Sequence, residues 1–271
     1  MHLSKHHGLG NDFLVVLDER NGVALDIDAD CARCLCERHL GIGADGLLHG
    51  SAPSAGNVSD VDVVMELFNS DGSLAEMSGN GIRCFAQAVA IARGIDEGAL
   101  RVLTGAGVRL LGLSGGPSAR DMVVRVDMGS VAGGPPVPDA LDVPGERCLT
   151  VELGNPHLVV LVGDQPPSGR SLAEQGTRLQ AGFESGINVE FARVLTRDRV
   201  ELTVWERGAG ATLACGTGAT ATAWALRQWD LVGDTASVSM PGGDVEVTFD
   251  RDGRATLVGP THHVADLEVP W

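Results

Sequence analysis

Two short segments of the chain place a small nucleophilic side chain directly before a Gly-x-Gly. Ser78 precedes Gly79-Asn80-Gly81, and Cys215 precedes Gly216-Thr217-Gly218. A hydroxyl or a thiol can donate or accept a proton, and two such groups on opposite faces of one carbon atom could invert its configuration without a cofactor. The two segments lie 137 positions apart in a chain of 271 residues. This spacing suggests two similar halves that each offer one reactive atom.

Apolar residues with helical spacing follow each Gly-x-Gly at once. They predict helices over about residues 82–93 and 218–229, so that each reactive side chain lies at a helix N-terminus. Unpaired backbone N–H groups at a helix N-terminus favour negative charge. We therefore expect a depressed pKa for the Cys215 thiol and a place for a substrate anion beside it.

Short valine-rich runs bounded by Gly, Pro, Asn or Asp predict the strands. These runs cover residues 12–17, 61–68, 122–126, 157–162, 200–205 and 245–249. Turn signals at 104–107 and 250–254 predict hairpins, so much of the sheet should be antiparallel. Further helices are predicted at about 28–39 and 171–181, with a linker at 114–118 and a surface loop at 132–138. The sequence predicts an α+β fold of two pseudo-repeated domains with a cleft between them.

Composition limits the class of protein. A chain of 271 residues with 44% apolar and 21% charged residues can bury a core. The formal net charge of −16 would repel phosphate backbones and anionic membranes, which argues against a nucleic-acid or membrane partner. The N-terminal residues lack the apolar core of a signal peptide, and no apolar run has the length of a membrane span. We expect a cytoplasmic protein.

The six cysteines have irregular spacing, which is typical of a reducing compartment rather than of a disulfide framework. Cys31, Cys34 and Cys36 form a C-x-x-C-x-C cluster, a spacing that zinc sites also use. Because no second cysteine pair or histidine pair follows, and because Asp28 or Asp30 can cap a helix there, we interpret the cluster as part of a helix. No metal site is predicted.

Further polar motifs stand at the ends of predicted strands, and together with the twin helix termini they resemble one known family. The motifs are H-G-L-G-N-D-F from His7, D-G-S-x-A-E-M-x-G-N-G-I-R-C from Asp71, G-N-P-H from Gly154, G-I-N-V-E from Gly186 and E-R-G-x-G-x-T-x-x-C-G-T-G from Glu206. In this order and at these spacings the chain resembles diaminopimelate epimerase over nearly its whole length.

The resemblance implies an isomerase that needs no pyridoxal phosphate or other cofactor and interconverts LL- and meso-2,6-diaminopimelate in lysine and peptidoglycan precursor synthesis. It implies two α/β domains, each with a mostly antiparallel sheet wrapped around a central helix and with the active site in the cleft between them. The expected domains are residues 1–115 with 262–271, and residues 116–261. A homodimer is the default that the resemblance implies.

The resemblance also implies roles for individual residues. Cys215 and Ser78 would be the acid/base pair, and His157 and Glu206 would tune it. The backbones of Gly79, Asn80, Gly216 and Thr217 would hold the α-carboxylate. Amide and guanidinium groups suit an ammonium-and-carboxylate head. The residues expected to bind the distal amino acid end are Asn11, Asn69, Asn155, Asn188, Glu206 and Arg207.

Ser78 departs from the family pattern, which has cysteine at both central positions. A hydroxyl is much less acidic than a thiol, and each pKa unit adds about 1.4 kcal/mol to the cost of forming the base. Ser78 could be a natural partner of Cys215, an engineered replacement, or the mark of a diverged protein with little turnover. Retention of the other polar positions argues against the last of these.

Three other functions compete with this interpretation. Residues 216–221 fit the dinucleotide fingerprint G-x-G-x-x-A, but residues 212–215 make a poor preceding strand. A proline or hydroxyproline isomerase would share the two-domain plan, whereas Arg207 and the four asparagines favour a longer substrate with a second amino acid head. An amino acid binding protein without turnover is the alternative that Ser78 leaves open.

Overall fold

The computed structural model describes residues 1–54 and 60–270, which form two compact units. The first unit contains Met1–Asp127 and the chain from Val258 onward, and the second contains Met128–Leu257. The chain leaves the first unit within one long strand and returns to it within the last strand. Across the described residues, no helix combines the length and apolar content that membrane crossing requires.

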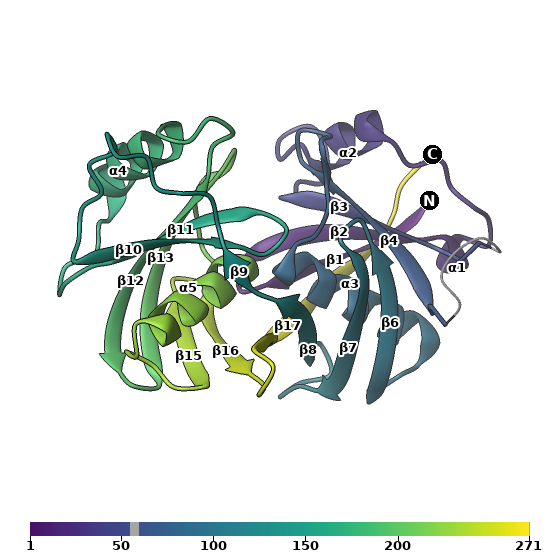
Figure 1. Ribbon diagram of the computed structural model, residues 1–271. Coiled ribbons are helices and arrows are strands. Elements are labelled where there is room, and N and C mark those ends of the chain that lie inside the picture. The colour runs from purple at the N-terminus through teal and green to yellow at the C-terminus, as the bar shows by residue number, and fades with distance from the viewer. Residues whose placement is uncertain (55–59, 271) are drawn as a thin grey trace. The chain divides into compact units, whose positions relative to one another are not determined.

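In its described residues the first unit holds three helices, with strands around the longest of them (Figure 1). Its elements are β1 (His2–Gly8), β2 (Asn11–Leu17), α1 (Asp18–Asn21), α2 (Ala29–Cys36), β3 (Gly46–Ser51), β4 (Val63–Asn69), β5 (Leu74–Ala75), α3 (Gly79–Arg93), β6 (Gly98–Thr104), β7 (Gly107–Gly115), most of β8 (Asp121–Ser130) and the second part of β17 (Arg254–Glu268).

The second unit repeats this plan with two helices. Its elements are β9 (Ala132–Gly133), β10 (Arg147–Glu152), β11 (Pro156–Leu161), α4 (Gly169–Ala181), β12 (Asn188–Thr196), β13 (Arg199–Glu206), β14 (Gly210–Thr212), α5 (Gly216–Gln228), β15 (Thr235–Met240), β16 (Gly243–Phe249) and the start of β17.

Strand pairing is duplicated as well. In the first unit β2 pairs with β3 in parallel, and so does β4 with β6; in the second unit β11–β12 and β13–β15 are the parallel pairs. The hairpins β1–β2, β6–β7, β10–β11 and β15–β16 are antiparallel. The register makes positions equivalent between units: Phe13 pairs with Gly46 as His157 pairs with Asn188. The prediction of a mixed α+β, mostly antiparallel fold with a repeated domain is confirmed.

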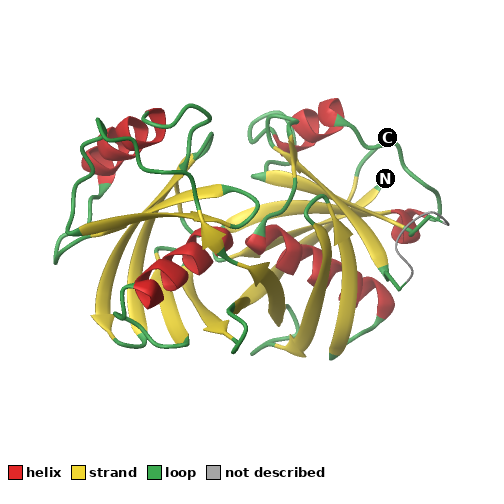
Figure 2. Cartoon of the chain, in the orientation of Figure 1, coloured by secondary structure: helices red, strands yellow, loops and turns green. Residues whose placement is uncertain are grey.

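A central helix organises each unit, as the cartoon in Figure 2 shows. Helix α3 is buried continuously from Gly79 to Ala90 and contacts β1, β2, β3 and β7. Helix α5 is buried from Gly216 to Ala223 and contacts β10, β11, β12, β13, β15 and β16. Both helices are rich in alanine, a small residue with high helix propensity, so strands can approach them from several sides.

The other face of each sheet is covered by a second helix. Leu14 and Val16 of β2 pack against Leu35 of α2, whereas the alternate residue Leu17 points toward α3. In the second unit Val160 and Phe191 pack against α4 in the same way. Because strand side chains alternate between faces, the residues between them turn toward the N-terminus of the central helix. That alternation places the polar residues of β11 and β12 beside α5.

Three predictions about chain organisation differ from the structure. Residues 114–118 do not link the domains, because β7 and β8 pair antiparallel around that turn and stay in one unit. The unit boundary therefore falls at 127/128 instead of 115/116, and the return to the first unit at 257/258 instead of 261/262. The central helices begin at Gly79 and Gly216, three and two residues before the predicted starts, because each Gly-x-Gly forms the first turn.

Candidate active site

Ser78 is the N-cap of α3. Its backbone is extended (φ −132°, ψ 126°), and its Oγ accepts a hydrogen bond of 3.0 Å from the backbone N–H of Gly81. A Cβ at Gly81 would come within 3.1 Å of the Ser78 Cβ and 3.3 Å of the Phe13 ring. A side chain at this second glycine of the motif would therefore crowd the Ser78 cap and the Phe13 ring of β2. One hydroxyl stands at a helix N-terminus, as predicted.

Amide side chains line this end of α3. Asn80 is buried and donates from Nδ2 to Asn11 Oδ1 at 3.1 Å. Asn11 in turn donates from Nδ2 to Asp45 Oδ2 at 2.7 Å, which fixes the orientation of its amide. Arg38 bridges Asp45 and Asp12, with 2.7 and 2.8 Å between Nη2 and the two carboxylates. The predicted residues Asn11 and Asn80 thus belong to one network with Ser78 at its edge.

A buried cation lies one turn inside the same helix. Arg83 is fully buried, and it donates from Nη1 to the Gly79 carbonyl at 3.0 Å and from Nη2 to Asn80 Oδ1 at 2.8 Å. Burial lowers the pKa of its guanidinium to about 10, so the group still carries a charge at neutral pH. Together with the helix N-terminus, this charge favours an anion beside Ser78.

Asn69 lies at the end of β4, opposite Gly46 of β3. It is exposed, and its Nδ2 donates to Ser73 Oγ at 3.0 Å within its own turn. The next residue, Ser70, donates its backbone N–H to the Asp45 carbonyl. Asn69 is therefore near the Asn11–Asp45 network, and its amide is engaged by its own turn instead of by Ser78 or Asn80.

Cys215 is the N-cap of α5 in the second unit. Its backbone is extended (φ −134°, ψ 114°), and its Sγ accepts from the Gly218 N–H at 3.4 Å and lies 3.4 Å from Thr217 Oγ1. Cys215 is only 5% exposed. The thiol and the Ser78 hydroxyl thus occupy equivalent caps in the two halves of the repeat.

His157 stands on β11 and is completely buried. Its Nδ1 lies 2.7 Å from Glu190 Oε1, and its Nε2 lies 2.9 Å from Asn155 Oδ1. Asn155 reaches Thr217 on the first turn of α5, with 3.5 Å between Nδ2 and Oγ1. The structure therefore brings the predicted residues His157, Asn155 and Thr217 together, with Glu190 behind them.

Glu206 approaches Cys215 from the end of β13. Its Oε1 accepts from Thr212 Oγ1, and its carboxyl is within hydrogen-bonding reach of the Cys215 thiol. Burial raises the pKa of Glu206. Burial also raises the pKa of Cys215 well above its ordinary value, and the carboxyl of Glu206 raises it further. The prediction of a depressed thiol pKa was wrong, because desolvation and the acidic neighbour Glu206 outweigh the helix terminus and the bonds from Thr217 and Gly218.

Asn188 and Arg207 form the remaining polar pair of this half. Asn188 is buried, donates from Nδ2 to the Pro156 carbonyl at 3.2 Å and accepts from the Arg207 backbone N–H at 2.9 Å. The Arg207 side chain is exposed and donates from Nη1 to the Ser185 carbonyl at 3.0 Å. The Arg207 guanidinium thus has further N–H donors that are free to bind a ligand.

Sequence reasoning missed three residues of these networks: Asp45, Arg83 and Glu190. Glu190 had a recognisable signal, because it stands two positions after Asn188 in an apolar strand and must therefore share its face. Arg83 lies at a buried position of a helix that has no other charge before its last turn. Asp45 had no signal of its own, because its partners come from β2 and from the turn that follows α2.

Comparison with solved structures shows the class of fold. The chain aligns with a predicted epimerase from Pseudomonas aeruginosa at a TM-score of 0.74 and 17% identity, covering 99% of this chain and 98% of that one. It aligns with a probable proline racemase from Agrobacterium radiobacter at 0.74 and 16%, covering 99% and 92%. A hydroxyproline epimerase from Agrobacterium vitis gives 0.70 and 17%, covering 99% and 90%. The fold is that of these epimerases and racemases.

Sequence comparison shows the family. The family model described as diaminopimelate epimerase matches residues 3–132 and 149–264. Diaminopimelate epimerase of Synechocystis sp. is 39% identical and covers 96% of each chain. That of Pelotomaculum thermopropionicum is 37% identical and covers 100% of this chain and 99% of the relative. The chain belongs to the diaminopimelate epimerase family.

Proposed function

We propose that this protein interconverts LL- and meso-2,6-diaminopimelate by moving the α-proton between two acid/base groups, without a cofactor. The observation that carries the proposal is the repeated cap: Ser78 and Cys215 each stand at the N-terminus of a buried central helix in a member of this family. The backbone N–H groups behind each cap suit the α-carboxylate of an amino acid. Their dipoles would also stabilise the carbanion that forms when the proton leaves.

The protonation of the two groups determines how the reaction starts. Cys215 is a neutral thiol at rest because its pKa is raised, and the Ser78 hydroxyl is also protonated at neutral pH. A two-base inversion needs one proton donor and one acceptor. Glu206 is the base beside the Cys215 thiol, and burial raises its pKa and so makes it a better acceptor. In this proposal Glu206 takes the thiol proton, Cys215 acts as the base, and Ser78 supplies the proton to the opposite face.

The distal amino acid end of the substrate would be read by Arg207 with Asn11, Asn69, Asn155, Asn188 and Glu206. Directional amide and guanidinium bonds distinguish a second carboxylate from a methylene chain. Gly79, Asn80, Gly216 and Thr217 would hold the α-carboxylate, and His157 would tune the acid/base pair. We further propose that the protein is cytoplasmic and that it forms a homodimer. Sedimentation of the purified protein would test the homodimer.

The test uses purified protein in deuterated water. Incubation with LL-diaminopimelate should incorporate deuterium at the α-carbon and form the meso isomer, both detectable by NMR and chiral chromatography. Cys215→Ala should abolish both signals while leaving substrate affinity by calorimetry within a few-fold. If neither exchange nor inversion occurs although diaminopimelate binds, the chain is a binding protein. If proline exchanges and diaminopimelate does not, the substrate assignment is wrong.

A further inference from the structure

A continuous line of polar contacts connects a buried carboxyl to the reactive sulfur in the second unit. Glu190 Oε1 lies 2.7 Å from His157 Nδ1, and His157 Nε2 lies 2.9 Å from Asn155 Oδ1. Asn155 Nδ2 lies 3.5 Å from Thr217 Oγ1, and Thr217 Oγ1 lies 3.4 Å from Cys215 Sγ. Among the described residues, no direct hydrogen bond joins Glu190 to Cys215. Glu190 is connected to the sulfur through His157, Asn155 and Thr217.

The direction of the hydrogen bonds follows from the chemistry of the amide. Asn155 Oδ1 can only accept, so His157 Nε2 must carry a proton. Nδ1 then either accepts from a protonated Glu190 or donates, as part of an imidazolium, to an ionised Glu190. In both cases the pair holds one proton more than an ionised Glu190 beside a neutral His157 would hold, and the pair is neutral overall. A neutral pair suits its surroundings, because both side chains are completely buried and Glu190 Oε2 has no hydrogen-bond partner among the described residues.

The Asn155–Thr217 and Thr217–Cys215 contacts continue this donor-to-acceptor order as far as the thiol. Because Asn155 presents Oδ1 to His157, its Nδ2 donates to Thr217 Oγ1, and the Thr217 hydroxyl proton is free to point at Cys215 Sγ. A donor at this position stabilises a thiolate. We propose that Glu190 is a positioning residue that aims the Thr217 hydroxyl proton at Cys215 through His157 and Asn155. Bonds that point the same way polarise one another, which strengthens the last one.

Loss of the extra proton from the Glu190–His157 pair would reverse the donor and acceptor roles along the line of contacts. An ionised Glu190 beside a neutral His157 takes the proton of Nδ1, which leaves Nε2 as an acceptor. The Asn155 amide must then turn to donate to His157, and the Thr217 hydroxyl must donate to Asn155 Oδ1 instead of to the sulfur. Proton occupancy of the Glu190–His157 pair thus decides whether Cys215 Sγ receives a hydrogen bond from Thr217.

The described residues of the first unit form no equivalent line of contacts, although its fold is the same. The equivalents of His157 and Glu190 are the apolar Phe13 and Leu48, as the strand register shows. Asn11, the equivalent of Asn155, is turned the other way: it accepts from the helix residue Asn80 and donates to Asp45. The line toward the sulfur is therefore specific to the half that carries the thiol.

Other ionisable groups near the line could act by charge alone, so the test must separate charge from direction. Glu206 faces the thiol from β13, and Glu190 faces it from β12. If Glu190 acted as a simple negative charge, removing that charge would lower the pKa of Cys215. If Glu190 aims the line, Glu190→Gln keeps the direction, because an amide N–H replaces the carboxylic O–H toward His157 Nδ1, and the thiol pKa stays the same.

The experiment measures the rate at which iodoacetamide labels Cys215 as a function of pH, by mass spectrometry of the Cys215 peptide, with exposed Cys34 as the reference in each sample. In Glu190→Gln the midpoint of the pH dependence of Cys215 labelling should stay within about 0.3 pH units of its value in the unaltered protein. The double variant His157→Phe with Glu190→Leu copies the pair Phe13 and Leu48 that the repeated fold already packs, and it should raise the midpoint by about one unit, which is a tenfold slower labelling at fixed pH. Thr217→Val should raise it equally, and Thr217→Ser should not.

Two results would overturn the proposal. A lowered midpoint in Glu190→Gln would show that charge and not direction is what Glu190 contributes. An unchanged midpoint in the double variant would show that the line does not reach the sulfur. The inference deepens the proposed function, since it assumes that Cys215 is the reactive group. The labelling assay does not use diaminopimelate, however, so a failure of the substrate assignment leaves its outcome unaffected.

Discussion

Gly218 lies directly against Glu190: a Cβ built on this glycine would stand 2.9 Å from Glu190 Oε1. The same Cβ would stand 3.3 Å from Cys215 Sγ. The second glycine of the motif therefore allows the first turn of α5 to approach both the buried carboxyl and the thiol. Gly81 does the same in the first unit, where the close neighbours are Ser78 and the Phe13 ring.

Gly218→Ala tests this relationship. Neither Glu190 nor the sulfur can move away easily, since both are buried, so we expect a loss of about 1–3 kcal/mol in the free energy of unfolding. We also expect at least tenfold slower epimerisation. Denaturant titration and the turnover assay measure the two effects. Gly163→Ala is the matched control, because a Cβ at this position would meet no atom within 4 Å outside its chain neighbours; equal effects at both positions would refute the close-approach argument.

Arg207 leads to a prediction about specificity. Its backbone is fixed by Asn188, and its exposed guanidinium has donors left for a carboxylate. Lysine lacks the second carboxylate of diaminopimelate, so it would leave these donors unpaired. We expect at least hundredfold weaker binding of lysine by calorimetry, and a much smaller preference in Arg207→Met. Comparable affinities for lysine and diaminopimelate in the unaltered protein would contradict this assignment.

The site could be predicted from the sequence where local pattern decides it. The helix caps at Ser78 and Cys215 follow from a motif and the periodicity after it, and both were found. The thiol pKa could not be predicted, because burial by surrounding strands and the position of Glu206 depend on tertiary packing. The strand pattern puts Glu190 on the same face as Asn188, but its pairing with His157 could not be predicted, because His157 comes from a neighbouring strand. The unit boundary was misplaced because Gly and Pro mark a tight hairpin as strongly as a linker.

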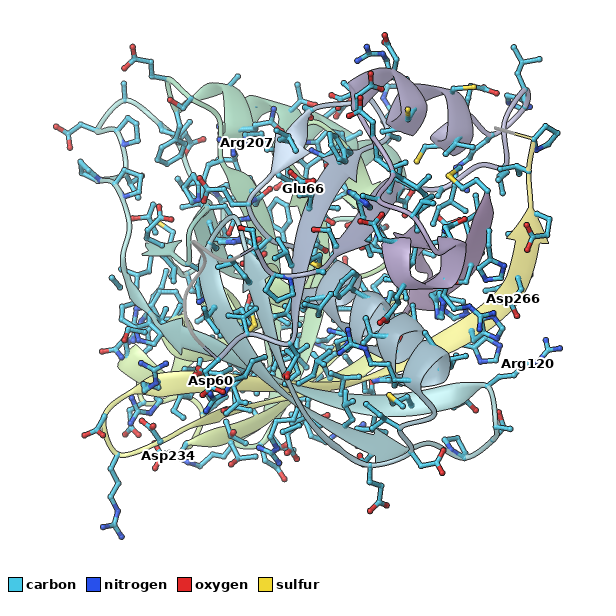
Figure 3. All side chains as sticks on the ribbon, turned by 90° about the vertical axis from the view of Figure 1, so that its right-hand side faces the viewer. Asp60, Glu66, Arg120, Arg207, Asp234 and Asp266 are labelled. Atoms are coloured by element: carbon cyan, nitrogen blue, oxygen red, sulfur yellow. The ribbon has the colours of Figure 1, made fainter. Side chains whose placement is uncertain are left out.

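The buried His6 predicts an acid-sensitive fold. His6 contacts Gln87 Oε1 through Nδ1 and Ser4 Oγ through Nε2, both at 2.9 Å, and its ring lies near His263 of β17, the strand that also carries exposed Asp266 (Figure 3). Burial lowers its pKa from 6.5 to about 4. Between these pH values the unfolded chain binds a proton that the folded chain refuses, so stability falls as pH falls through this window.

The expected loss from His6 is about 3 kcal/mol between pH 6.5 and 4, since each pKa unit corresponds to about 1.4 kcal/mol. Urea titrations across this range should show a weaker pH dependence in His6→Gln, which cannot be protonated. His39, an exposed histidine, provides the control, and His39→Gln should keep the full pH dependence. An unaltered slope in His6→Gln would assign the acid sensitivity to other groups.

Ser78 gives the last prediction, which concerns the asymmetry of the proposed acid/base pair. In one direction Cys215 removes the α-proton and Ser78 supplies one; in the other, a hydroxyl of much higher pKa must act as the base. One diastereomer should therefore exchange its α-proton in deuterated water faster than it inverts. Ser78→Cys should raise the inversion rate at least about a hundredfold, the lower end of what a positioned acid/base group contributes.

The cap geometry makes Ser78→Cys a conservative change, because Cys215 already accepts from the third N–H of α5 as Ser78 does from that of α3. Ser78→Ala removes both the cap and the proton donor. It should lower the free energy of unfolding by about 0.5–2 kcal/mol and abolish inversion. If Ser78→Cys inverts no faster than the starting protein while Ser78→Ala is inactive, the hydroxyl suffices as the partner of Cys215. If Ser78→Ala inverts as fast as the starting protein, Ser78 takes no part in the chemistry, and its role is limited to capping α3.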